Sequence, residues 1–289
     1  MLKLKTSRNL GLAYILITYL VAVGVGVAVF AFAPFAIWLN FLIADIAATV
    51  VVYLFSLIVN NATVYDPYWS VLPMIAVPLL MISAGNFSAT NILILVCVEF
   101  WGVRLTINWI TTFKDLTKQD WRYDEIKSKS GKLYPLANLF GIQIFPTLIV
   151  YGCLFPFVYG LGSTAFSWFA LIGVAVMILG TLLELISDAQ KHKFYDAVDE
   201  NGNRKNSGIC AVGLWKSSRH PNYLGEILFW WGLWGAVFAV SSELWWTAFG
   251  ALANTIMFLA VSTPWAERQS AKRHGAAEWE EYKKETRLF

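Results

Sequence analysis

Long apolar runs, separated by short polar connections, follow one another along most of the sequence. The runs lie at residues 10–33, 35–59, 68–82, 90–113, 139–159, 165–187, 222–240 and 244–263. Each approaches the roughly 20 residues that a helix needs to cross a bilayer, although the third is short and contains Pro73 and Pro78. The pattern predicts an all-α integral membrane bundle of about eight transmembrane helices. We expect one domain over residues 1–289, with residues 1–60 forming two N-terminal helices.

The composition agrees with this pattern. The chain is 57% hydrophobic and only 14% charged, which is too apolar and too poor in charge for an ordinary soluble domain. Its three cysteines are odd in number, and Cys97 and Cys153 lie inside apolar runs, so we expect free thiols and no disulfide framework. Residues 196–207 form the most loop-like stretch and are expected to be a mobile excursion.

The basic residues predict the orientation of the chain. Of the 22 Lys and Arg residues, all except Arg104 fall in four segments, which are 3–8, 114–132, 191–219 and 268–287. With eight spans these segments lie on one side of the membrane, as the positive-inside rule requires, whereas seven spans break the rule. We therefore expect both termini to be cytoplasmic. The expected membrane is a bacterial inner membrane, with the endoplasmic reticulum as the alternative for a eukaryotic source.

Charged residues inside the apolar runs need a physical reason, because each costs at least about 2.5–3.5 kcal/mol in hydrocarbon. They are Asp45, Glu99, Arg104, Glu184 and Glu226. All except Asp45 are expected near the cytoplasmic ends of their helices. One interpretation is mutual ion pairing that helps the helices pack. The other, which we favour for the set as a whole, is a polar cavity open to the cytosol. Asp45 is either a substrate-side group or a lone protonated carboxyl.

The densest group of polar side chains precedes the seventh run, in the sequence LWKSSRHPNYLGEILFWW at residues 214–231. Pro221 suits the first position of a helix, so a helix should begin near His220. Unpaired N–H groups and the helix dipole favour an anion at such a start, and Arg219 adds positive charge. The alternatives are a basic patch that faces anionic lipid and an aromatic belt at the membrane boundary.

Four stretches of the chain, in order, resemble the steroid 5-alpha-reductase-like family of membrane reductases, particularly its branch of uncharacterised bacterial enzymes. They are WGVRL at 101–105, DWRY at 120–123, ELISDAQKHKF at 184–194 and GLWKSSRHPNYLGE at 213–226. A basic and aromatic tail at 267–289 completes the resemblance, which covers roughly residues 60–289. It implies a reductase-like core over residues 61–289 that binds NADPH in cytosolic loops.

The resemblance also implies roles for single residues in cofactor binding. Those expected at the nicotinamide half or the riboses are Asp188, Asn222, Tyr223 and Glu226. Those expected at the phosphates are Lys191, Arg219, His220, Arg268 and Tyr282, and the predicted set is completed by Trp215, Arg104 and Glu184. A pyrophosphate and a 2′-phosphate suit arginine and a helix N-terminus. No GxGxxG motif follows a strand, so a Rossmann domain is not expected, and no metal site is predicted.

The family reaction is hydride delivery from NADPH to an electron-poor C=C bond, assisted by an acid. The steroid enzymes carry a tyrosine acid at the position that Trp101 occupies here, three residues before Arg104. The substitutes that the sequence offers are Glu99, Asp66 and Tyr68. The expected substrate is an apolar lipid or steroid-like molecule, with membrane lipids around the chain and no nucleic-acid partner.

Two other functions fit the same residues. Membrane methyltransferases of the isoprenylcysteine or phospholipid type also use an RHPxYxG turn. They hold S-adenosylmethionine with an acidic–basic pair that Glu267 and Arg268 would match. A non-catalytic lipid-binding relative is the third possibility. The SDAQ element at 187–190 and the supply of basic residues favour the reductase, because S-adenosylmethionine carries no phosphate.

Overall fold

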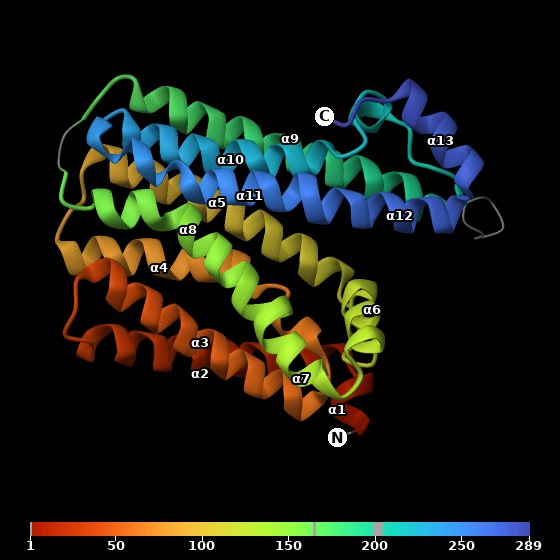
Figure 1. Cartoon of the computed structure of the whole chain (residues 1–289), viewed down its shortest axis with the longest axis horizontal. Helices are drawn as coiled ribbons and strands as arrows, with labels where there is room; N and C mark the ends of the chain where they lie inside the picture. The colour runs from red at the N-terminus through yellow and green to blue at the C-terminus, as the bar shows by residue number, and fades with distance from the viewer. Residues whose placement is uncertain (1, 164–165, 199–204) are drawn as a thin grey trace. The chain divides into compact units, whose positions relative to one another are not determined.

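The computed structural model of the chain describes residues 2–163, 166–198 and 205–289, and within these ranges the elements are helical, without a strand (Figure 1). This confirms the all-α class that the apolar runs predict. The predicted loop at 196–207 lies partly outside the described residues. The three cysteines lie within the described ranges, are buried and are not joined by a disulfide.

The helices follow the predicted runs closely. In the described ranges the α-helices are α1 (Leu2–Thr6), α2 (Arg8–Phe32), α3 (Ile37–Val59), α4 (Tyr68–Ala84), α5 (Ala89–Thr112), α6 (Trp121–Ser130), α7 (Tyr134–Ala137), α8 (Phe145–Gly160), α9 (Ala170–Asp196), α10 (Pro221–Phe238), α11 (Phe249–Met257), α12 (Thr263–His274) and α13 (Ala276–Glu285). Short 3-10 turns at Ala62–Tyr65, Gly131–Leu133, Gly213–Lys216 and Ser242–Ala248 connect them. Two π-helical turns, Asn138–Ile144 and Phe258–Ser262, lead into α8 and α12.

Seven helical segments of the described chain are long and apolar enough to cross a membrane. They are Arg8–Phe32, Ile37–Val59, Ala62–Ala84, Ala89–Thr112, Trp121–Gly160, Ala170–Asp196 and Ser242–His274. The predicted span at 222–240 forms α10, a helix of 18 residues, which is not among the seven. Asn222, Tyr223 and Glu226 make its first half too polar. The count of eight spans, and with it the cytoplasmic placement of both termini, therefore depends on α10.

The chain divides into two compact units, and α5 contributes to both. The N-terminal unit comprises Met1–Phe87 and Val98–Thr164. The C-terminal unit comprises Ser88–Cys97 and Ala165–Phe289. The expectation of one transmembrane domain with a boundary near residue 60 stays a prediction.

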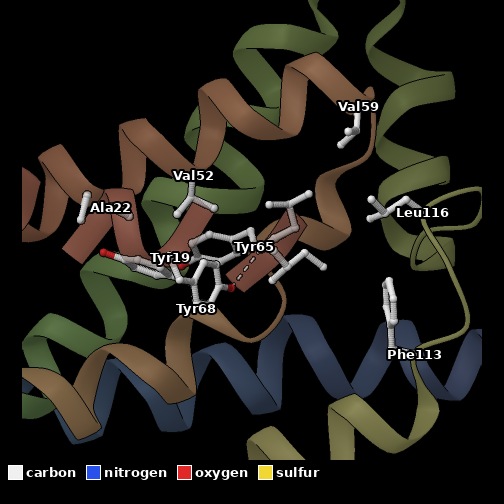
Figure 2. Close-up of a cluster of buried hydrophobic side chains, with 11 residues drawn as sticks. Tyr19, Ala22, Val52, Val59, Tyr65, Tyr68, Phe113 and Leu116 are labelled. Atoms are coloured by element: carbon white, nitrogen blue, oxygen red, sulfur yellow. Dashed lines mark hydrogen bonds between the residues drawn. The ribbon is translucent and has the colours of Figure 1, made fainter. Parts of the chain in front are cut away.

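In the N-terminal unit, α2 lies alongside α3, and a buried cluster joins them to the start of α4 (Figures 1 and 2). Figure 2 shows the rings of Tyr19 and Tyr68 at one end of this cluster and Phe113 and Leu116 at the other. The Tyr19 hydroxyl donates to the Val64 carbonyl at 3.0 Å, so its polar end is satisfied inside the apolar core.

Buried polar side chains tie α3 to α8 and to the π-helical turn before it. Gln143 Nε2 donates to Ser56 Oγ at 3.1 Å. The hydroxyl of Thr147 lies 3.0 Å from that of Thr49 and 2.8 Å from that of Tyr65. Because buried polar groups need hydrogen-bond partners inside the protein, these bonds fix the register of α3 against α8.

In the C-terminal unit, α9 and α10 run side by side with their backbones in close approach (Figure 1). A Cβ atom on Gly180 would lie 2.5 Å from the Gly225 carbonyl oxygen and 2.8 Å from the Phe229 nitrogen. A Cβ atom on Gly232 would lie 2.7 Å from the Gly173 carbonyl oxygen. The obstructing atoms are backbone atoms, which cannot move aside without shifting a whole helix. Glycine at these positions therefore sets the separation and the register of the pair.

We expect Gly180→Ala to destabilise the chain by about 1–3 kcal/mol, because the added methyl group overpacks the α9–α10 contact. Gly24 of α2 is the matched control, since an added Cβ atom there would meet nothing within 4 Å. Gly24→Ala should leave the melting temperature unchanged or raise it slightly, through better helix propensity. Thermal unfolding of the purified chain in detergent, followed by circular dichroism, measures both. Equal effects of the two substitutions would contradict the close approach.

Candidate functional site

A hollow of about 90 Å³ in the C-terminal unit gathers many of the residues predicted to bind a cofactor. It is formed by the C-terminal end of α9, the start of α10, and α12 and α13. The predicted residues that line it are Lys191, Trp215, Arg219, His220, Asn222, Tyr223 and Tyr282. The other lining residues are Tyr195, Ile209, Cys210, Ala266, Ser270, His274 and Trp279. Basic and aromatic side chains from distant parts of the sequence thus converge on one small space.

The turn at Gly213–Lys216 is pinned to the last turns of α9. Gly213 has a φ of 55°, a conformation that favours glycine, and a Cβ atom there would clash with the side chain of Gln190. Gln190 Oε1 accepts the Leu214 N–H at 2.8 Å, and the Trp215 indole N–H donates to the Ser187 carbonyl at 2.8 Å. These bonds hold the Trp215 ring in the wall of the hollow.

The Lys191 ammonium lies over that ring, with its Nζ atom 4.1 Å from the ring centroid. The distance is well within the range of a cation–π contact. Lys191 comes from α9 and Trp215 from the turn before α10, so the contact also fixes a positive charge between the two segments.

His220 is the N-cap of α10, and its side chain makes no capping hydrogen bond. Its ring stacks on that of Tyr223, with centroids 5.0 Å apart. The side chain is only 8% exposed, and its Nε2 atom has no hydrogen-bond partner among the described residues. Burial lowers the pKa of His220 to about 4, Glu267 opposes this shift, and the neighbouring Lys191 and Arg219 act in the same direction as burial. His220 is therefore neutral at pH 7.

Arg219 binds the C-terminal end of the chain. Its Nε atom donates to Glu267 Oε1 at 2.8 Å, and its Nη1 atom donates to the carbonyls of Thr286 and Lys283. Its backbone N–H donates to the Arg287 carbonyl at 2.9 Å. Glu267 Oε1 also lies 3.5 Å from His220 Nε2. The guanidinium is thus neutralised by one carboxylate and anchors the tail.

The tail in turn closes one side of the hollow. Trp279 and Tyr282 of α13 are buried, and the Tyr282 hydroxyl donates to the Trp215 carbonyl at 2.5 Å. Burial raises the pKa of Tyr282 to about 12, so this hydroxyl keeps its proton at neutral pH. The hollow therefore depends on the segment after α12 for its closure.

Several predicted cofactor residues lie outside this hollow. Glu184 and Glu226 are buried where α9 and α10 pack, and Glu226 Oε1 accepts the Trp230 indole N–H at 2.6 Å. Asp188 is partly exposed on α9 and does not line the hollow. Arg268 is exposed, and its Nε atom donates to the Pro264 carbonyl at 3.3 Å. Arg104 is buried in the N-terminal unit.

Some lining residues were not anticipated. Trp279 and Cys210 contribute walls, and burial raises the pKa of the Cys210 thiol so that it stays uncharged. Gln190 positions the 213–216 turn without lining the hollow. The SDAQ element was the feature of the sequence that could have indicated this role, because the side-chain amide of Gln190 can accept an unpaired backbone N–H. No pattern in the sequence indicated Cys210.

The three predicted catalytic residues occupy different environments in the N-terminal unit. Tyr68 lines an apolar cavity of about 150 Å³ between α2, α3 and α4, and its hydroxyl donates to Asp45 Oδ1 at 2.8 Å. Asp45 is 1% exposed, and its Oδ2 atom has no partner among the described residues. Asp66 instead accepts the Tyr123 hydroxyl at 2.6 Å, and Glu99 is partly exposed. Neither Asp66 nor Glu99 lines the cavity.

These features define a helical protein with candidate membrane spans and a basic, aromatic hollow at a helix start. The chain belongs to the family described as protein of unknown function, DUF1295, which matches residues 52–286. It is 27% identical over 238 residues to the uncharacterized protein C594.04c of Schizosaccharomyces pombe, which covers 74% of this chain and 69% of that protein. No solved structure matches the chain significantly. The family match includes the hollow and Tyr68, and it excludes Asp45.

We expect Arg219→Gln to release the tail, because it removes the charged donor that binds Glu267 and the Thr286 carbonyl. Amide hydrogen exchange of residues 279–289 should become on the order of tenfold faster or more. Arg268→Gln is the control, because exposed Arg268 donates only to a carbonyl of its own helix. Unchanged exchange in Arg219→Gln, or equal acceleration in both variants, would show that Arg219 does not hold the tail.

Proposed function

We propose that the chain is an NADPH-dependent membrane reductase that adds a hydride to an activated C=C bond of an apolar lipid or steroid-like substrate. The observation that carries the proposal is the hollow, where Lys191, Arg219 and buried His220 Nε2 meet at the start of α10. Positive charge at a helix N-terminus suits phosphate groups. The resemblance of residues 184–194 and 213–226 to steroid 5-alpha-reductase-like enzymes supports the same assignment.

The charges of the hollow suit NADPH, whereas the volume of the hollow is large enough for only part of the NADPH molecule. About 90 Å³ is less than the roughly 300–1,000 Å³ of typical small-molecule sites. A phosphate at Arg219 would also have to replace the carboxylate of Glu267. We therefore infer that Lys191, Arg219 and His220 would hold phosphate groups and that Trp215 and Tyr282 would flank a ring, after the tail has moved outward. When bound, NADPH supplies a hydride.

The acid of the reaction is assigned to Asp45 and Tyr68. The cavity that they line is otherwise apolar, which suits a lipid or steroid-like substrate. The Tyr68 hydroxyl donates to Asp45 Oδ1, and the partnerless Oδ2 is the atom from which a carboxyl proton could be given to the substrate. Glu99 and Asp66 are less suited because they do not line this cavity.

We further propose that the cofactor is held at the cytoplasmic face. The support is the distribution of Lys and Arg, since the segments 191–219 and 268–287 are among the four that hold all basic residues except Arg104. With α10 as an eighth span, both termini would be cytoplasmic. The chain would then be a multi-pass protein whose soluble cofactor reaches it from the cytosol.

Cofactor titration of the purified chain in detergent tests the proposal directly. NADPH should bind, and Lys191→Gln should weaken binding on the order of tenfold, because it removes one cation from the phosphates. Lys193→Gln is the matched control, since Lys193 lies on the same helix and is exposed. Binding of S-adenosylmethionine without NADPH would replace the reductase with a methyltransferase. NADPH binding without turnover of any enone or sterol-like lipid would favour a non-catalytic lipid-binding protein.

Substitution of the proposed acid tests the chemistry separately from cofactor binding. We expect Asp45→Asn and Tyr68→Phe to lower NADPH oxidation with an apolar enone by about 100-fold or more while NADPH affinity stays the same. Tyr19→Phe is the control, because Tyr19 lines the same cavity but donates to a backbone carbonyl. Full activity of Asp45→Asn would remove Asp45 from the mechanism.

A further inference from the structure

A second hollow, of about 520 Å³, lies in the N-terminal unit and has a different character. Its lining is polar, and three lysine side chains face it, namely Lys5, Lys118 and Lys127. The remaining lining comes from two short stretches, 60–61 and 116–119, and from Asp124 of α6. None of these residues takes part in the proposed reductase.

Hydrogen bonds between distant segments hold the walls of this hollow in place. Asn61 is buried, and its Nδ2 atom donates to the carbonyls of Leu116 and Lys118, both at 2.9 Å. The Leu116 N–H donates to the Lys5 carbonyl at 2.9 Å. The Ala62 N–H donates to Gln119 Oε1 at 3.1 Å. Three of the four segments that line the hollow, namely residue 5, residues 60–61 and residues 116–119, are therefore fixed to one another.

The hollow carries an excess of positive charge, with three lysines and one carboxylate, that of Asp124, in its lining. Within the part of the chain that the structure describes, Lys5, Lys118 and Lys127 form no ion pair. The Lys127 ammonium donates to the amide oxygen of Asn60 at 3.2 Å. The one acidic lining residue, Asp124, accepts the Gln119 amide at 2.7 Å. Three ammonium groups against one carboxylate leave net positive charge for an anion.

Asn60 contributes through its backbone as well. It caps the C-terminus of α3 in the left-handed conformation, with a φ of 47°. This conformation is uncommon outside glycine and is tolerated best by asparagine. It ends α3 abruptly and turns the Asn60 side chain to the ammonium of Lys127.

The hollow lies at the ends of three helices that are long and apolar enough to cross a membrane. Asn60 and Asn61 directly follow α3, Lys118 lies in the connection after α5, and Lys5 precedes α2. Beneath it, Leu116 is 1% exposed in the apolar cluster of Figure 2. A polar, basic hollow above the apolar ends of spans is at the depth where lipid phosphates lie.

We propose that this hollow binds the phosphate group of an anionic phospholipid. A headgroup with a net negative charge matches three ammonium groups, whereas the quaternary amine of phosphatidylcholine would be repelled by them. Inorganic phosphate offers the same oxygens, but it lacks the acyl chains that would lie along the apolar ends of the neighbouring helices. The proposal does not depend on the reductase assignment, because none of its residues belongs to that site.

Lipid titration of the purified full chain in a neutral detergent tests the proposal. Native mass spectrometry and thermal shift should both report preferential binding of phosphatidylglycerol over phosphatidylcholine. The triple substitution Lys5→Gln, Lys118→Gln and Lys127→Gln should weaken phosphatidylglycerol binding on the order of tenfold or more. The matched control replaces Lys3, Lys114 and Lys132, which are exposed and do not line the hollow, and it should keep the affinity.

Three outcomes would overturn the proposal. Equal losses in both triple variants would indicate general attraction to surface charge. Competition by millimolar inorganic phosphate, with no preference among lipids, would indicate a free anion instead of a lipid. Unchanged affinity in the single variant Lys118→Gln, where the exposed side chain makes folding defects irrelevant, would exclude the hollow itself. A severalfold loss in that variant supports it.

Discussion

Backbone atoms of α9 and α10 lie so close that no side chain fits between them at Gly180, Gly225 or Gly232. The arrangement of the candidate cofactor site depends on this contact. It places the end of α9, with Lys191, beside the start of α10, with His220. A shift of one helix by a single residue would separate these groups and would also break the bonds that pin the 213–216 turn to α9. Glycines that do not line the hollow thereby set its geometry.

The candidate cofactor site also depends on neutralising the nearly buried guanidinium of Arg219. Arg219 is 12% exposed, and an unpaired charge at such a place is strongly destabilising. Glu267 and the tail carbonyls provide the partners. A phosphate could replace Glu267 at similar electrostatic cost, so ligand binding and release of the tail would be linked. The small volume of the hollow and the bonds of Arg219 have one origin, because the tail both covers the hollow and pairs the arginine.

The sequence predicted the features that depend on residues close together in the chain. Apolar runs predicted the helices because backbone groups in an apolar environment must bond within their own segment. Pro221 correctly marked the start of α10, because its ring favours the first helical turn. The sequence predicted a membrane span at 222–240, which forms α10. The polar side chains in the first half of α10 make this helix less apolar than the seven candidate spans.

Contacts between distant segments could not be predicted in the same way. The bond between Asp45 and Tyr68 joins two helices, and nothing in either run identifies its partner. Nothing in the basic and aromatic tail at 267–289 indicated which of its side chains would cover the hollow, so Trp279 was missed. In the sequence, the lysines of the N-terminal hollow were noted only among the basic residues that predict the orientation of the chain. Their convergence could not be predicted, because it depends on the hydrogen bonds of the buried Asn61 side chain.

The tail of the chain also has a consequence for biosynthesis. Arg219 bonds to the carbonyls of residues 286 and 287, and Ser218 bonds to that of residue 288, so these partners are synthesised long after the arginine. Domains generally fold from the N-terminus during translation. The α9–α10 pair is therefore synthesised while Arg219 still lacks its partners at residues 286 and 287. A ribosome that stalls between Arg219 and residue 286 would leave these helices with an open pocket and an unpaired guanidinium.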